Sequence, residues 1–459
     1  KLYFHAGQLL RDSSVEKVNN LYHVKMKDLP RKRQIELHAY WPRSAFAEAP
    51  DQGLEEERLT DFNRIESNIA TEKAQSEILM KWVFPVIFMS LLLLVPLFYR
   101  KFRQSTSIKK VFPKDHRLYE PPMDLPPMVL AEAVYSTSLE EVNPLNKSGF
   151  GKFTFERLIQ ATLLDLVDRG HLSIFQGDEE PYVRIISEKG LSNFEKECLR
   201  MTLSNKKELA ISELFPDYQV SSSLYRGAKE SDEKHIRETG SRLKSSFEGR
   251  LQRIQSCVKD KVHVLRIPSY YRSLTSEERR LALGMRVCSA ITALGGLLFF
   301  YYSWQTHGFF SIPFLLLGLT GLGASFWVYL ATRGAYRDGV LTEEGAEIFY
   351  LWTSFENMLR DIAHLDQAEL ESIVLWNRLL VYATLFGYAK KVSKLMKVRH
   401  IQLENPDLNL YVAYGWHSQF YTSTAQIKQY TAVANTASNY SVSSGSGSSG
   451  GGFSGGGGG

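Results

Sequence analysis

The sequence has few cysteines, little net charge and no leader-like start. Its three cysteines form no C-x-x-C pair, which argues against a disulfide framework and against a zinc knuckle. A formal net charge of +5 over 459 residues is weak for nucleic-acid binding. The first residue is not methionine, and no basic start with a short apolar stretch precedes the strand-like residues 2–6. We therefore expect no signal peptide and a chain that lacks its true N-terminus.

Catalytic and metal-binding motifs are also missing. The eleven histidines include no H-E-x-x-H pattern and no pair at metal-ligand spacing. No nucleophile stands beside a general base in a known pattern, and no glycine-rich loop has the full phosphate-binding spacing. We therefore predict no catalytic, cofactor-binding or metal-binding residue, and a protein that is not an enzyme and has no cofactor.

Long apolar runs, in contrast, occur at three places. Residues 82–99 form about 18 residues without a charge, close to the ~20 that cross the hydrocarbon core. Residues 281–302 and 309–330 form two more runs, joined by a short polar turn. Aromatic residues near the ends of the runs are typical of membrane interfaces. The alternative is buried core helices of a soluble protein, but three transmembrane helices explain the aromatic ends better.

Small residues interrupt the second and third runs. The glycines concerned are Gly295, Gly296, Gly318 and Gly321. Glycine lets two helix backbones approach closely in a membrane. We expect these four positions to pack the two helices as an antiparallel hairpin.

Basic residues flank the spans on one side. Those after the first span are Arg100, Lys101, Arg103, Lys109 and Lys110. Because Lys and Arg are retained on the cytoplasmic side, this places the N-terminal segment outside the plasma membrane and the rest of the soluble chain inside. The same five side chains are candidates for contact with anionic lipid, although a plain topology signal also accounts for them.

The segment before the first span, residues 1–81, is predicted to contain β-strands followed by a helix. Residues 1–53 contain aromatic and branched runs with turn residues between them, which predicts the end of a β-sandwich whose earlier strands are missing. Residues 54–81 are charged and helix-prone, and predict a helical stalk. At the other end, residues 436–459 are rich in Ser and Gly and are expected to be disordered.

The inner region 100–280 contains a module, residues 150–215, that resembles a winged helix. Thr154 begins a helix with apolar residues at helical spacing, and two short strands follow it. Ser192 and Glu195 form a capping box for a helix over 193–203. Acidic residues on the first helix and on the hairpin would repel DNA, so we favour a protein-contact or structural role.

Further helices are predicted on both sides of the hairpin of spans. Thr275 and Glu278 cap the helix that enters the second span. The inner region 331–435 is helical, with a helix from Thr342 to Arg360. Residues 373–386 are apolar but too short for a fourth span, and predict a core or interfacial helix.

Several stretches together resemble a known family. FERLIQATLLDLVDRGHLSI (residues 155–174), the W-x-x-F-x-x-x-L-R-D and L-W-x-x-L-x-x-Y-A patterns within residues 341–386, and the tail GGGFSGGGGG are similar to the YciQ-like predicted membrane proteins, a bacterial family of unknown function. The resemblance covers nearly the whole chain and the order of its spans. It implies an outer β-domain, one span, an inner region, a helical hairpin and a glycine tail. It implies no activity and no catalytic residues.

These observations predict a mainly α membrane protein with a partial β-sandwich, three transmembrane helices and a cytoplasmic winged-helix-like α/β module. We expect it to be a non-enzymatic sensor or scaffold that couples an outer β-domain to a cytoplasmic protein-interaction module. Its partners are then the lipid bilayer and a cytoplasmic or membrane protein, rather than nucleic acid. The alternatives are an accessory subunit of a transport or envelope-assembly complex, and a membrane-tethered DNA-binding regulator.

Overall fold

The computed structural model describes residues 2–5, 13–19, 21–26, 36–41, 55–145, 152–305 and 311–441. The chain forms two compact units. Lys1–Ser107 and Arg272–Val340 form the first, called here the bundle unit; Ile108–Tyr271 and Leu341–Gly459 form the second, the globular unit. The chain therefore passes from one unit to the other three times.

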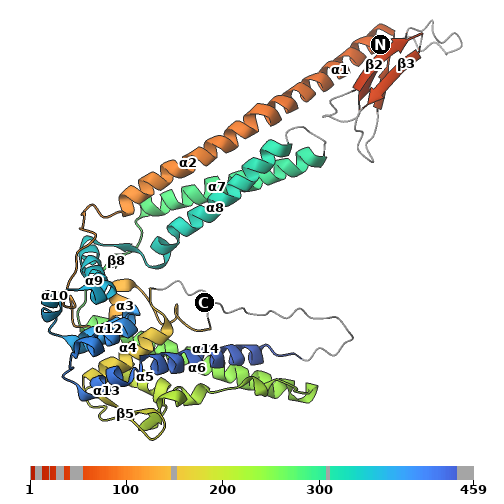
Figure 1. Ribbon diagram of the computed structural model, residues 1–459. Helices are drawn as coiled ribbons and strands as arrows, with labels where there is room; N and C mark the ends of the chain where they lie inside the picture. Colours follow the sequence, from red (N-terminus) through yellow and green to blue (C-terminus); the bar gives the residue numbers. More distant parts are fainter. Residues whose placement is uncertain are drawn as a thin grey trace. The chain divides into compact units, whose positions relative to one another are not determined.

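Three long helices dominate the bundle unit (Figure 1). The first is continuous: α1 (Glu55–Ile78), a π-helical turn η2 (Leu79–Val83) and α2 (Phe84–Thr106). The other two are α7 (Ser276–Gln305) and α8 (Ser311–Arg337). All three are long and apolar enough to cross a membrane. They extend beyond the predicted spans because the helical backbone continues into polar turns on either side of each apolar run.

Apolar side chains cover the outside of these helices. Leu93 on α2, Leu298 on α7 and Phe326 on α8 are each more than 60 % exposed. Such a surface would be unfavourable in water, whereas it suits contact with lipid chains. The helices pack together through a smaller interior set: Phe88, Val95, Phe102, Met285, Phe314, Leu317 and Val328. The prediction of a membrane protein with three apolar helices is confirmed.

The N-terminal strands form two antiparallel pairs. β1 (Leu2–His5) pairs with β4 (Glu36–Ala39), and β2 (Ser13–Val18) pairs with β3 (Leu21–Met26). Three of these strands lie where the sequence predicts them, and β2 is an addition. Two pairs of strands do not by themselves define a sandwich, so the β-sandwich stays a prediction.

The globular unit is helical, with one small sheet. Its helices and strands follow in the order α3 (Pro127–Tyr135), α4 (Phe155–Asp168), β5 (Leu172–Gln176), β6 (Pro181–Ile185), α5 (Asn193–Leu203), β7 (Glu208–Ala210), α6 (Glu233–Val264), α9 (Glu343–Asp361), α10 (Gln367–Glu371), α11 (Trp376–Phe386), α12 (Ala389–Arg399), α13 (Pro406–Tyr414) and α14 (His417–Ser438). The two-residue strands β8 (Tyr271–Arg272) and β9 (Val340–Leu341) contain the points where the chain changes units.

The predicted helix–hairpin–helix segment is present. Thr154 is the N-cap of α4, with its side chain accepting from the N–H of Arg157. β5 and β6 pair antiparallel, and β7 joins β6 to complete a three-stranded sheet. Ser192 and Glu195 form the expected capping box at the start of α5. The helices and strands of this segment are those that the sequence predicts. Their assignment to the winged-helix class stays a prediction.

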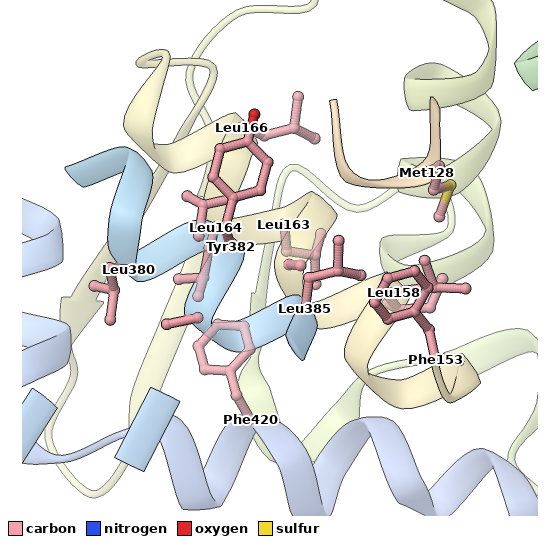
Figure 2. Close-up of a cluster of buried hydrophobic side chains, with 14 of the residues drawn as sticks. Met128, Phe153, Leu158, Leu163, Leu164, Leu166, Leu380, Tyr382, Leu385 and Phe420 are labelled. Carbon is pink, nitrogen blue, oxygen red and sulfur yellow. The ribbon is translucent and has the colours of Figure 1, made fainter. Parts of the chain in front are cut away.

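The core of the globular unit is built around α4 (Figure 2). Leu158, Leu163 and Leu166 of α4 are at most 1 % exposed. They pack in a cluster with α3, α11 and α14, represented by Met128, Leu385 and Phe420. α11 supplies a continuous buried segment, Leu379 to Leu385. Residues 373–386 therefore contain a core helix, and not a fourth span.

Two boundaries differ from the sequence analysis. The regions 100–280 and 331–435 were treated as separate, whereas the structure joins most of both in one unit with a common core. Residues 272–280 belong instead to the bundle unit. At the C-terminus α14 continues to Ser438, past the predicted start of the tail at 436. Residues 442–459, which hold the rest of the predicted disordered tail, lie outside the described residues.

Candidate functional site

The predicted glycine positions lie at helix contacts in the bundle unit. A Cβ on Gly296 would come within 2.4 Å of the backbone nitrogen of Gly318, and one on Gly321 within 2.5 Å of that of Ala293. Gly318 lies against Leu297, so these three glycines belong to the contact between α7 and α8. Gly295 instead faces the ring of Phe88 on α2. The four glycines therefore serve two helix contacts, where one was predicted.

The five predicted lipid-contact residues are all exposed, but they are divided between the units. Arg100, Lys101 and Arg103 lie near the end of α2. Lys109 and Lys110 follow in the globular unit, where the Nζ of Lys110 lies 3.0 Å from a carboxylate oxygen of Glu347. Lys110 is thus the least suited of the five to hold an anionic headgroup.

A buried carboxylate fastens two helix ends of the bundle unit. Glu278 is fully buried and accepts two bonds from Arg272, at 2.7 and 2.8 Å. It also accepts from the hydroxyl of Ser105 at 2.8 Å and from the N–H of Thr275 at 2.8 Å. The Thr275–Glu278 cap predicted from the sequence is present, and it also ties the last turn of α2 to the start of α7.

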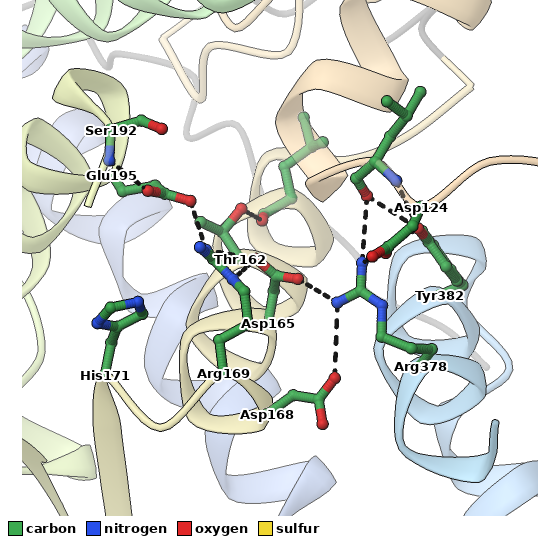
Figure 3. Close-up of polar contacts among 12 residues, drawn as sticks. Asp124, Thr162, Asp165, Asp168, Arg169, His171, Ser192, Glu195, Arg378 and Tyr382 are labelled. Atoms are coloured by element: carbon green, nitrogen blue, oxygen red, sulfur yellow. Dashed lines mark hydrogen bonds and ion pairs between the residues drawn. The ribbon is translucent and has the colours of Figure 1, made fainter. Parts of the chain in front are cut away.

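A second polar cluster holds the helices of the globular unit together (Figure 3). Arg378 of α11 forms ion pairs with Asp165 of α4 and with Asp124, and lies 3.6 Å from Asp168. Arg169 bridges Asp165, at 2.7 Å, to Glu195 of α5. Asp165 and Glu195 are each 1 % exposed, so both carboxylates depend on these arginines for compensation.

Burial shifts the pKa values of several groups in this cluster. It raises the pKa of Asp168, with partial offset by Arg378. It also raises the pKa of Tyr382 to about 12, so the phenol stays neutral and donates to the carbonyl of Leu125 at 2.9 Å. Burial opposes the charge of Arg378, but Tyr382 and Asp165 outweigh it and raise the pKa of the guanidinium. Tyr382 therefore stays neutral and Arg378 stays charged through the physiological range, which indicates a structural role for both.

The globular unit also contains a cavity of about 330 Å³ that is partly open to solvent. We call it the cationic cavity, because Arg157 and Lys390 line it and none of its described lining residues is acidic. The remaining polar lining comes from Gln160, Thr384, His417, Ser418, Tyr421 and Thr422. The volume lies at the small end of the ~300–1,000 Å³ range of small-molecule pockets. Four separate helices, α4, α11, α12 and α14, contribute to it.

Hydrogen bonds behind the cavity hold its floor in place. The amide nitrogen of Gln160 donates to the hydroxyl of Tyr411 at 3.0 Å and to the carbonyl of His417 at 3.2 Å. The hydroxyl of Thr384 donates back to the carbonyl of Leu380, one turn earlier in α11. Gln160, Thr384 and Tyr411 are almost fully buried. The start of α14 is therefore joined to the middle of α4 by a fixed polar contact.

Arg157 is positioned by a glycine. Gly387 ends α11 with φ = +87°, in the left-handed region that favours glycine. A Cβ at this position would come within 2.5 Å of the guanidinium carbon of Arg157. The guanidinium thus lies directly against the backbone of Gly387. The adjacent carboxylate of Glu156 pairs with Lys428 at 2.8 Å, so it does not compensate Arg157.

His417 is the titratable group in the wall of the cavity. Among the described residues neither of its ring nitrogens has a hydrogen-bond partner, and both are inaccessible to solvent. Burial lowers the pKa of His417, and the charges of Lys390 and Lys397 lower it further. The ring is therefore neutral at neutral pH.

We expect this histidine to make the protein less stable in mild acid. Its folded pKa is below the unfolded value of about 6.5, so the unfolded state binds the proton first and stability falls as pH drops below that value. The loss cannot be steeper than about 1.4 kcal/mol per pH unit, the limit for one proton. Denaturant unfolding at pH 5 and pH 7 should show a smaller loss for His417→Gln. His263→Gln, at an exposed site in the last turn of α6, should leave the loss unchanged; an equal change in both variants would contradict the assignment.

The sequence analysis did not identify the residues of this cavity. Arg157, Lys390 and His417 stand in no motif. Gln160 and His417, which make contact, are 257 positions apart in the chain. A local signal existed only at Gly387, where a glycine after an apolar run predicts a helix end.

The chemistry available here is recognition of an anion. Two cations and the hydroxyl of Ser418 line one space, with a neutral imidazole beside them. His417 forms no hydrogen bond to a hydroxyl or carboxylate of the described residues, as a general base that activates a nucleophile would. Among the residues that the structure describes, no group of three or more His, Cys, Asp or Glu side chains could hold a metal ion.

One family model matches the chain. Its description is "Predicted membrane protein (DUF2207) C-terminal domain", and it covers residues 115–396, more than half of the chain. The matched range includes residues 115–271 and 341–396 of the globular unit and the helices α7 and α8, whereas α13 and α14 follow it. No curated protein and no solved structure matches the sequence.

Proposed function

Because the chain belongs to the DUF2207 family of predicted membrane proteins, we propose that it is a non-enzymatic membrane sensor or scaffold whose globular unit binds a ligand or partner on the cytoplasmic side. The match confirms the recognition made from the sequence: a predicted membrane protein with a domain of unknown function, compatible with the YciQ-like resemblance. The binding role and the orientation are our own proposals.

The observation that carries the proposal is the triple connection between the units. The chain changes units at 107/108, 271/272 and 340/341. Ser105 and Arg272 stand beside the first two of these points, and both bond to the buried Glu278. A change in the packing of α2 against α7 would therefore act on two chain connections at once. This arrangement suits the transmission of a conformational change better than a single flexible tether would.

Charge supports a cytoplasmic globular unit. Arg100, Lys101 and Arg103 follow the first apolar run, and further arginines precede the second run and follow the third. Each of these positions lies next to one of the three connections to the globular unit. Positive charge next to a span is retained in the cytoplasm.

Binding is favoured over catalysis by the cationic cavity. Its lining offers positive charge and hydrogen-bond donors, but no carboxylate or thiol. A DNA-reading role is disfavoured by the burial of α4, the first helix of the winged-helix-like module. Its side chains are mostly in the core, so the helix has no free face to insert into a groove.

A cysteine-accessibility experiment tests the orientation. Of the native cysteines, Cys198 is fully buried with its pKa raised by burial to about 12, so it is a poor reporter. Val111, 92 % exposed in the globular unit, and Ser67, exposed on α1, are better sites for an introduced cysteine. The background is Cys257→Ser, in which the two remaining native cysteines, Cys198 and Cys288, are buried. With a membrane-impermeant maleimide on intact cells, we expect Ser67→Cys to react at once and Val111→Cys to react only after the membrane is opened.

The reverse pattern would place the globular unit outside, and the cytoplasmic role would then be wrong. Labelling of both sites in intact cells would show that the apolar helices do not separate them. In both variants the reaction after permeabilisation is the control, because it shows that the introduced thiol is accessible in the folded protein.

A further inference from the structure

We propose that the cationic cavity of the globular unit binds the phosphate group of a small phosphomonoester, held between Arg157 and Lys390. This inference rests on the proposed binding role of the globular unit and names the chemical class of its ligand. It is carried by the cavity itself and by the charges that converge on it.

The two cations are available for a ligand. Among the described residues no acidic side chain forms an ion pair with Arg157 or Lys390. The carboxylate of Glu156, the residue next to Arg157 in the sequence, forms an ion pair with Lys428 on α14. Two uncompensated charges that line one cavity repel each other, and an anion between them relieves this repulsion.

The number of charges favours phosphate over carboxylate. A phosphomonoester carries about −1.5 to −2 charges at pH 7 and three strong acceptor oxygens. Arg157 offers a planar fork of donors and Lys390 a single mobile ammonium group, the two usual partners of phosphate oxygens. A single carboxylate would compensate only one of the two cations.

Hydrogen-bond donors of the lining complete the site. Ser418 of α14 carries a hydroxyl group at the cavity, whereas the hydroxyls of Thr422 and Thr384 donate to the backbone carbonyls of Ser418 and Leu380 and act there only as acceptors. Ser418 lies in the first turn of a 22-residue helix, where backbone N–H groups have no acceptor within the helix. Tyr421 adds an aromatic ring to the lining. The volume of about 330 Å³ admits a phosphate on a small organic group, and excludes a folded peptide.

The fixed geometry favours specific binding. Arg157 rests against the backbone of Gly387, and the start of α14 is fastened to α4 through Gln160. Side chains that are already held lose little entropy when the ligand arrives. A phosphate bound here would bridge α4, α12 and α14.

The test is isothermal titration calorimetry on the full-length protein in detergent. Glycerol 3-phosphate and inorganic phosphate are the probes, at constant ionic strength, with sulfate and succinate for comparison. We expect glycerol 3-phosphate to bind, and Arg157→Gln and Lys390→Met each to weaken it tenfold or more, as expected for the loss of a charge-assisted bond. Lys259→Met, at an exposed position on α6, is the matched control and should bind as wild type. The melting temperature of each unliganded variant shows that it is folded.

A second arm identifies the source of the phosphate group. The melting temperature is measured in nanodiscs with and without phosphatidic acid, whose headgroup is a phosphomonoester. Stabilisation by this lipid that is lost in Arg157→Gln, without binding of glycerol 3-phosphate, would place the ligand in the membrane. Binding of glycerol 3-phosphate itself would indicate a soluble metabolite. Both results support the proposal.

Two results would overturn it, and they have different meanings. Succinate binding that depends on Arg157, without binding of either phosphate probe, would reject the phosphomonoester but leave the globular unit as a binding module. The cavity would be rejected as the site if none of the anions bound and phosphatidic acid gave no stabilisation. Binding that persists in both Arg157→Gln and Lys390→Met would reject it as well. The cysteine-accessibility experiment is independent of these outcomes.

Discussion

Replacing Arg378 by methionine is expected to destabilise the globular unit by about 3–5 kcal/mol, the usual cost of leaving a buried charge without its partner. The guanidinium is only 14 % exposed and compensates Asp165, which is 1 % exposed. Methionine has a similar length and fills the space, so the loss comes from charge and not from a cavity. Asp165 would retain only Arg169 as a charged partner, and Arg169 is shared with Glu195.

The measurement is urea-induced unfolding of the full-length protein in detergent, followed by pulse proteolysis of the globular unit. Arg360→Met is the matched control, because Arg360 is 54 % exposed and its pair with Asp361 is 3.4 Å long. Exposed pairs of this kind contribute about 0–1 kcal/mol. Adding Asp165→Asn to Arg378→Met should recover part of the stability, since it removes the uncompensated charge. Equal stabilities of Arg378→Met and Arg360→Met would show that the cluster in Figure 3 does not hold the unit together.

The second large effect is expected in the bundle unit, where Gly321→Ile should separate α7 from α8. A Cβ at Gly321 would lie 2.5 Å from the backbone nitrogen of Ala293, and backbone atoms cannot turn aside as a side chain can. The helices must move apart, which removes the close packing that holds such pairs together in lipid. We expect a loss of about 1–3 kcal/mol or more, as for overpacked interiors.

Gly323→Ile is the matched control, two positions further along the same helix. Nothing lies within 4 Å of a Cβ at Gly323, so the larger side chain has room there. Both substitutions change helix propensity alike, so the difference between them reports the contact alone. Unfolding in mixed micelles of increasing SDS content, followed by circular dichroism, measures it. Equal resistance to SDS in the two variants would contradict the helix contact.

Features that depend on neighbours in the sequence could be predicted from it. The three apolar helices follow from runs of side chains that avoid water wherever the rest of the chain lies. The caps at Thr154, Ser192 and Thr275 were found because each side chain bonds to backbone within three residues. The absence of a fourth span at residues 373–386 followed from length, since about 14 residues cannot cross the membrane, whereas the choice between a core and an interfacial helix came from the structure.

Features that depend on distant parts of the chain were missed. The pairing of Arg378 with Asp165 joins positions 213 residues apart. The cationic cavity takes Arg157 from one half of the globular unit, and Lys390 and His417 from the other, with α7 and α8 between them in the sequence. No periodicity encodes such contacts, because they arise only when helices from both halves pack around α4.

The sequence by itself determined the class of this protein, its apolar helices, the starts of α4, α5, α7 and α9, and the strands β1, β3, β4, β5 and β6. Those properties come from local hydrogen bonding and from the transfer of apolar side chains out of water, and both act over short stretches of chain. Only the tertiary structure decided that residues 108–271 and 341–459 share one core, that Gly295 faces α2, and that two cations meet at one cavity. The physical reason is that side-chain packing between distant helices sets the positions of charges and cavities. Many sequences with the same hydrophobic pattern could pack their helices in different ways.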